Sequence, residues 1–138
     1  MRPDDVPVLG LLKQSMSFHA QRQRVIAENV ANANTPGYVA QDLDQGEFRR
    51  ALQDQLQARA GGSASVHSAA SVSALSSATR QWQSQDAPDS ETTVNGNSVV
   101  LEEQMIRANE TRLEYESALS LYQKSLSMIR TAIRQSGR

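Results

Sequence analysis

The side chains best suited to specific hydrogen bonding are crowded between residues 29 and 38. The set comprises Asn29, Asn32, Asn34, Thr35, Pro36, Gly37 and Tyr38. The three carboxamides come at the end of a helical pattern, where carbonyl groups lose their helical partners and can accept bonds. The proline and glycine suit the two corners of a type II turn, whose second corner requires a positive φ. The stretch therefore predicts a hydrogen-bonded helix end and turn, although an ordinary polar terminus followed by a loop has the same composition.

Catalytic or metal chemistry has little support in the rest of the sequence. The two histidines, His19 and His67, occur on different segments without a carboxylate at ligand spacing, so we expect no metal site. Cysteine is absent, which excludes disulfides and thiolate ligands. The serines lie in low-complexity sequence without a suitable base, and no phosphate-binding glycine loop occurs. We therefore expect neither an enzyme nor a cofactor, and no small-molecule substrate.

Composition favours an elongated helical body over a thick core. Of 138 residues, 38% are hydrophobic but 4% aromatic, and the net charge is −1 with both signs interspersed. The sequence has no basic patch, so we expect no nucleic acid partner. No apolar run approaches the ~20 residues of a membrane span. The first residues lack a signal-peptide core, which indicates the cytoplasm unless a dedicated export apparatus is used.

The elements that must position the 29–38 stretch are two long helices. The first is predicted over 9–33, where apolar residues recur at helical spacing. Its expected interface residues are Leu9, Leu12, Met16, Ile26 and Val30. His19 falls on the same seam and is expected to be a hydrogen-bonded packing residue. A second apolar line, formed by Leu11, Phe18 and Val25, widens this face.

The second long helix is predicted over 99–135 from a sustained heptad pattern. One line of the seam is Leu101, Ala108, Tyr115, Tyr122 and Ile129, and its companion is Met105, Leu119, Leu126 and Ile133, interrupted by Arg112. Ile106 and Leu113 lie beside this seam. At ~1.5 Å per residue, the second helix is longer than the first by about 18 Å. One pairing cannot bury every apolar line, so we expect neighbouring subunits to cover the remainder.

The middle of the chain has weaker signals. It begins extended after Tyr38 and regains helical character over 47–60, where Phe48, Leu52 and Leu56 recur at four-residue steps. That short helix could instead fold back and complete a three-helix bundle. From 61 to about 95 the chain is low-complexity and too sparse in apolar residues for a core. Trp82 within it either anchors to a partner or belongs to a loose loop, and Asn95-Gly96 indicates a tight turn.

The stretch Asn29-Val30-Ala31-Asn32-Ala33-Asn34-Thr35-Pro36-Gly37-Tyr38 resembles the N-terminal signature of bacterial flagellar rod and hook proteins. Asn95-Gly96-Asn97-Ser98-Val99-Val100-Leu101-Glu102-Glu103-Gln104-Met105 is similar to the C-terminal signature of the same axial family. The first match is carried by Asn32, Thr35, Pro36, Gly37 and Tyr38. The second is carried by Asn97, Val99, Leu101, Glu102 and Met105. The short length and the middle region resemble those of proximal rod members. One departure is Val100, where the family often has a helix-capping acid, so Asn97 or Ser98 is expected to cap instead.

The resemblance implies a mainly α fold, with the terminal helices paired as a coiled coil and an extended or partly β middle region. The expected divisions are 1–40, 41–97 and 98–138. It implies an elongated subunit of a helical assembly that transmits torque through the flagellar shaft. The implied partners are other copies, other rod proteins, the membrane-ring base with its rod adaptor, and the export gate. The implied location is the periplasmic rod, reached by type III export. A soluble helical adaptor that never polymerises is the alternative hypothesis.

Overall fold

The computed structural model describes residues 7–60 and 82–136 of the chain. In order, these residues form α1 (Pro7–Ala31), β1 (Gln41–Leu43), α2 (Gln45–Ala60), β2 (Ser84–Asp86) and α4 (Leu101–Ser136). The mainly helical fold and the long terminal helices that the sequence predicted are confirmed. The low-complexity residues 61–81, including His67, lie outside the described part, so the expectation for them stays a prediction.

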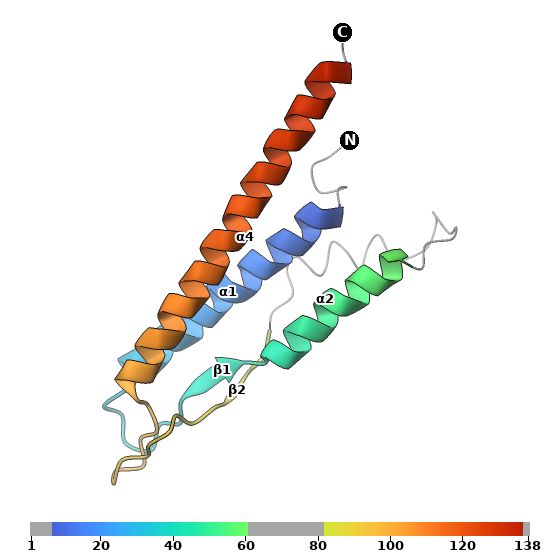
Figure 1. The fold of residues 1–138 in the computed structure, drawn as a ribbon. Coiled ribbons are helices and arrows are strands. Elements are labelled where there is room, and N and C mark those ends of the chain that lie inside the picture. Colours follow the sequence, from blue (N-terminus) through green and yellow to red (C-terminus); the bar gives the residue numbers. More distant parts are fainter. Residues whose placement is uncertain (1–6, 61–81, 137–138) are drawn as a thin grey trace.

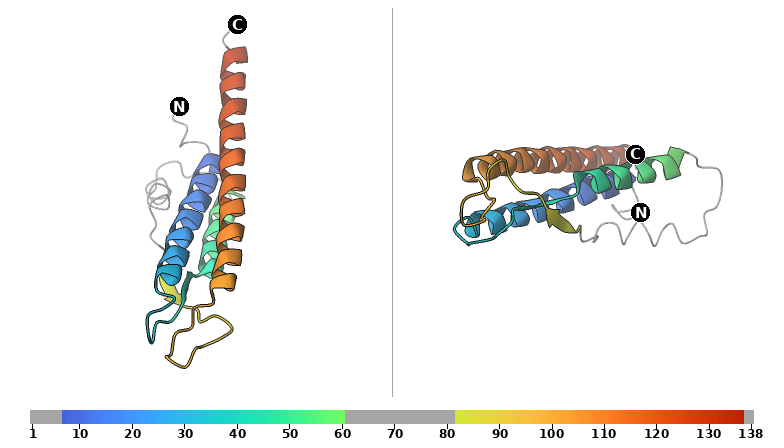
Figure 2. Two further views of the ribbon diagram at one scale, coloured as in Figure 1. Left: turned by 90° about the vertical axis from the view of Figure 1, so that its left-hand side faces the viewer. Right: turned by 90° about the horizontal axis from the view of Figure 1, so that it is seen from below.

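The two long helices lie side by side and run antiparallel, with the start of α1 and the end of α4 at the same end of the molecule (Figures 1 and 2). Asn29 lies opposite Gln104, and His19 lies opposite Glu114. Continued along both helices, this register places the first turn of α1 opposite about Leu126 of α4. The last ten or so residues of α4 therefore extend beyond the described part of α1.

Each helix begins where the sequence supplies a suitable first turn. α1 starts at Pro7, two residues earlier than predicted, and proline fits a first helical position because its missing N–H would have no helical partner. Asp44 caps α2, because its Oδ1 accepts bonds from the amides of Gly46 at 2.7 Å and Glu47 at 3.0 Å. α4 starts at Leu101, two residues later than predicted.

A small aromatic core joins α1, α2 and the strands. The rings of Phe18 and Phe48 stack at a centroid distance of 4.1 Å, and Trp82 meets both edge to face. Leu43 completes the buried cluster. β1 and β2 pair antiparallel, with Asp42 opposite Gln85. The expectation that Trp82 belongs to a loose loop or a partner contact is wrong, because the residue is 5% exposed inside this core.

In the view of Figure 1, α1 lies between α2 and α4, and α2 is not packed along α4, so the three described helices do not close into a bundle. α2 contacts α1 through the stacked rings and through Gln55, whose Nε2 donates to Oε1 of Gln14 at 2.8 Å. The described residues leave a groove between α2 and α4. Among the described residues, no helix combines the length and apolar character that crossing a membrane requires.

Candidate assembly site

The two terminal motifs meet at the end of the molecule where α1 stops and α4 starts. Asn97 is the central contact, because its Nδ2 donates to the carbonyl oxygens of Asn32 at 2.9 Å and Thr35 at 2.7 Å. Its Oδ1 accepts a bond from the amide of Val99 at 2.8 Å. One buried side chain therefore satisfies the carbonyls at the end of α1 and organises the entry to α4.

Backbone bonds hold the two turns against each other. The amide of Gly37 donates to the carbonyl of Asn95, and the amide of Ser98 donates to the carbonyl of Tyr38, each at 3.0 Å. Gly37 has a φ of 72° and Gly96 a φ of 82°. The Tyr38 amide lies 3.3 Å from the carbonyl of Thr35, which closes the turn at Gly37. A Cβ on Gly96 would lie 3.4 Å from the Cα of Gly37, so the glycines also permit close approach.

Asn29 connects the end of α1 to β1, to α4 and to Tyr38. Its Nδ2 donates to the carbonyl of Gln41 at 2.7 Å and to Oε1 of Gln104 at 3.0 Å. Its Oδ1 accepts from the amide of Gln41 at 2.9 Å and from the hydroxyl of Tyr38 at 3.1 Å. Partial burial, with a smaller effect of the Glu28 charge, raises the pKa of Tyr38, so the hydroxyl keeps the proton that it donates. The fully buried amide therefore has each of its polar atoms in use.

Asp89 supplies the acidic group that Val100 lacks. Its Oδ2 accepts a bond from the Val100 amide at 2.8 Å, which caps α4 from a position eleven residues earlier. Its carboxylate also accepts from Nε2 of Gln104, at 2.9 Å to Oδ2 and 3.1 Å to Oδ1. The guanidinium of Arg107 lies 2.7 Å from Oδ1. The sequence pattern did not single out Asp89, because a cap formed by a distant loop leaves no local spacing to read.

The remaining motif residues are placed differently. The hydroxyl of Thr35 donates to Oδ1 of Asn32 at 3.1 Å. Val99 is half-buried. The exposed members of the two motifs are Asn34, Thr35, Pro36, Gly37, Leu101, Glu102 and Met105. The structure thus brings part of each motif into one polar joint and leaves the other part on the surface.

The contact between α1 and α4 is centred on a line that the apolar pattern missed. The buried residues of α4 are Gln104, Thr111 and Ala118, at seven-residue spacing. The predicted seam flanks this line: Ala108, Tyr115, Leu119, Tyr122, Leu126 and Ile129 are half-buried. On α1, Leu9 and Ile26 are buried, and Leu12 and Met16 are half-buried. Val30 and Ile133, at 44% and 62% exposed, lie outside this intramolecular contact.

Farther from the joint, polar side chains of α1 also pair with α4 and with β1. His19 is 7% exposed, and its Nδ1 lies 3.2 Å from Oε2 of Glu114. Arg22 of α1 forms a two-pronged pair with Asp42 of β1, at 2.7 and 2.8 Å. Burial lowers the pKa of His19, Glu114 opposes this shift, and Arg22 adds to it. These pairs fix the rotation of α1 relative to its neighbours.

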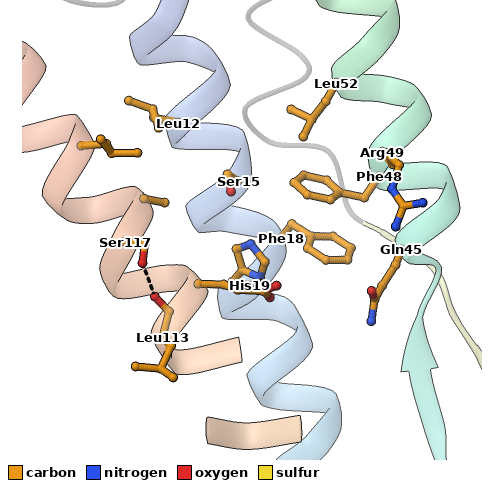
Figure 3. A pocket seen from close by; sticks show the side chains of 13 residues that line it. Leu12, Ser15, Phe18, His19, Gln45, Phe48, Arg49, Leu52, Leu113 and Ser117 are labelled. Carbon is orange, nitrogen blue, oxygen red and sulfur yellow. Dashed lines mark hydrogen bonds and ion pairs between the residues drawn. The ribbon is translucent and has the colours of Figure 1, made fainter. Parts of the chain in front are cut away.

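A groove of about 550 Å³ lies between α2 and α4, with α1 as its floor (Figure 3). Its apolar lining includes Leu12, Phe48, Leu52, Leu113 and Leu121. Polar groups on its rims include Arg49 of α2 and Glu114 of α4. In the part of the chain that the structure describes, no cluster of three or more potential metal ligands occurs.

A family model described as the flagella basal body rod protein matches residues 15–38, which cover most of α1 and the turn at Gly37. The matched class is that of components of the flagellar basal body rod. Over most of its length the chain is also similar to proteins named flagellar basal body rod protein FlgB. The relative from Cereibacter sphaeroides is 30% identical over 128 residues, covering 91% of this chain and 93% of the relative.

The relative from Escherichia coli (strain K12) is 29% identical over 117 residues, covering 81% of this chain and 82% of the relative. The relative from Aeromonas hydrophila is 25% identical over 126 residues, covering 91% of each. The chain therefore belongs to the family of the flagellar basal body rod protein FlgB, a family of structural rod proteins and not of enzymes.

Proposed function

We propose that this chain is a structural subunit of the flagellar proximal rod, which packs with copies of itself and with other rod proteins into a shaft that transmits torque. The observation that carries the proposal is the polar joint of Asn29, Asn97 and Asp89, which ties the two family motifs into one end of a helix pair. Such a joint makes α1 and α4 a single stiff unit, as a subunit that transmits torque requires.

The surface of α4 supports packing with neighbours on more than one side. Its exposed large apolar residues are Leu101, Met105, Ile106, Leu113, Leu121, Met128 and Ile133. At 3.6 residues per turn, Leu121 lies on one flank of the buried line, Met105 lies on the other, and Ile106 and Leu113 lie nearly opposite the buried line. Apolar surface on two flanks of one helix is more than an isolated monomer usually exposes. The arrangement therefore favours a subunit enclosed by others.

The finer parts of the proposal follow from family membership. We infer contacts with the membrane-ring base, its rod adaptor and the export gate below, and with other rod subunits above. We further infer export by the flagellar type III apparatus to a rod that crosses the periplasm. Within the subunit, 1–40 and 98–138 would carry the axial contacts, and 41–97 would brace them through the aromatic core and Asp89.

The experiment is complementation of a strain that lacks the native gene. The full chain should restore swimming and appear in isolated basal bodies, whereas a chain without residues 101–133 should do neither. Met105→Asp places a charge on an exposed apolar flank and should reduce incorporation. Ser120→Asp adds the same charge at an exposed position of the same helix that carries no apolar side chain; it is the matched control and should not reduce incorporation. Normal motility of the deletion strain would refute the proposal.

The alternative, a helical adaptor that binds one partner and never polymerises, rests on the groove between α2 and α4. Sedimentation of the purified chain at rising concentration, with and without other rod proteins, separates the two. A subunit should associate with rod proteins, while a well-folded monomer that ignores them would favour the adaptor.

A further inference from the structure

We infer that the groove between α2 and α4 receives the C-terminal end of α4 from a second copy of this chain, displaced along the helix axis. This inference rests on the proposed function and specifies one contact within the assembly. Two surfaces of one molecule, each incomplete in the described structure, carry it.

The first surface is the end of α4 itself. Beyond about Leu126 the helix has no described part of α1 beside it, yet its apolar pattern continues through Met128, Ile129 and Ile133. Met128 is 57% exposed and Ile133 is 62% exposed. A helix that keeps an apolar face where its intramolecular partner has stopped is suited to a second partner.

The second surface is the groove, whose walls are apolar and whose length matches that end. Along α4 it runs from Leu113 to Leu121, which corresponds to about 12 Å of helix. The end of α4 from Ser127 to Ser136 corresponds to about 14 Å. The same molecule cannot fill its own groove in this way, because both surfaces belong to one straight helix (Figure 2).

Charge along α4 selects the occupant. From Ser117 to Arg134 the sequence contains Lys124, Arg130 and Arg134 and no Asp or Glu. From Leu101 to Glu116 it contains five glutamates, of which Glu114 lines the groove and Glu110 lies one turn below on the same side, and two arginines. A basic helix end would thus be attracted to the α4 rim and turned away from Arg49 on the α2 rim (Figure 3).

The consequence is an open series of subunits. The helix end and the groove are different surfaces, so the contact is heterologous and can repeat from copy to copy without closing. With Ile129 and Ile133 in the groove, successive copies would be staggered by about 18 Å along α4.

Cysteine cross-linking tests this contact directly, because the chain has no cysteine of its own. Ile133→Cys in an untagged chain is mixed with Leu121→Cys in a tagged chain, so any product between the two sizes joins two molecules. The control replaces Leu121→Cys by Gln123→Cys, two residues on and turned about 160° from the groove. We expect at least about tenfold more product for 121–133 than for 123–133, since a disulfide needs Cα atoms within roughly 7 Å.

Reversing charges on the two surfaces is the second test of this contact. Arg130→Glu in the untagged chain should reduce the cross-link, and Glu114→Arg in the tagged chain should restore it. A second cysteine pair at the same twelve-residue offset, Ser117→Cys with Ile129→Cys, reports on the same contact if one substitution disturbs folding. Both tests are run on purified chains at high concentration and in basal bodies from cells that express the two chains.

Absence of preferred 121–133 cross-linking in both settings overturns the inference. So does an intramolecular cross-link between Leu121→Cys and Ser71→Cys in its place, which would make residues 61–81 the occupant, or a cross-link to another rod protein. If the chains enter basal bodies without the cross-link, this contact alone fails. If even the unsubstituted chain is absent from basal bodies, the proposed function fails.

Discussion

At the scale of single residues, His19 makes the stability of the fold depend on pH. Burial lowers its pKa from an ordinary value of 6.5, so the unfolded chain takes up a proton before the folded chain does. Above pH 6.5 both states are neutral and the folded state has no penalty. As pH falls below 6.5, stability should fall until the buried imidazole is itself protonated.

Urea unfolding followed by circular dichroism between pH 7.5 and 5 measures this effect. His19→Gln should flatten the decline. Glu114→Gln should steepen it, because Glu114 is the group that raises the pKa of His19. Glu110→Gln, also on α4 and exposed, is the matched control and should follow the native profile. A native profile that is flat over this range would show that His19 is not held neutral in the fold.

Asp89 shows which residues the sequence could not reveal. The asparagines, Gly37 and Tyr38 are recognisable because a helix end and a turn impose local spacing. Asp89 lies in polar sequence, and its contacts with Val100, Gln104 and Arg107 exist only after α4 has docked. The burial of Trp82 in the core was not predicted either, because a lone aromatic residue in a polar segment forms no hydrophobic period.

At the scale of elements, hydrophobic periodicity predicted both long helices to within two residues at each end but not the rotation of α4. It pointed to the line through Leu101 and Tyr115, whereas the buried line is Gln104, Thr111 and Ala118. Gln104 at the contact is hydrogen-bonded to Asn29 and Asp89, so it can be buried without an apolar pattern. The exposed apolar residues of α4, such as Leu101 and Met105, are then not needed for its contact with α1.

The turn after α1 is the element whose geometry is most sensitive to a single atom. Gly37 has a φ of 72°, so Gly37→Ala should destabilise the chain by about 1–2 kcal/mol. A Cβ on Gly10, within α1, would meet no atom within 4 Å apart from the helix's own backbone, and this glycine has no positive φ. Gly10→Ala should therefore stabilise the chain by roughly 0.5–1 kcal/mol. Urea unfolding midpoints of the two variants, measured together, should move in opposite directions; destabilisation by both or neither would reject the assignment of the turn.

At the scale of the whole molecule, the fold separates what holds the monomer together from what remains for neighbours. The polar joint, the aromatic core and the first 25 or so residues of α4 make the internal contacts that the structure describes. The end of α4 and the two apolar flanks of that helix make few of these internal contacts. Stability and assembly should therefore respond to different substitutions.

Truncation after Ser127 tests this separation. Removing residues 128–138 should change the free energy of unfolding of the monomer by no more than about 0.5–1 kcal/mol, because α4 has passed the start of α1 by then. Ala118→Asp, which buries a charge in the helix contact, should cost about 3 kcal/mol or more. The truncated chain should nevertheless fail to enter basal bodies, because it lacks the basic, apolar end that reaches the next subunit. A truncated chain that unfolds as easily as Ala118→Asp would show that the end of α4 belongs to the monomer's own core, and one that assembles normally would show that neighbours do not need it.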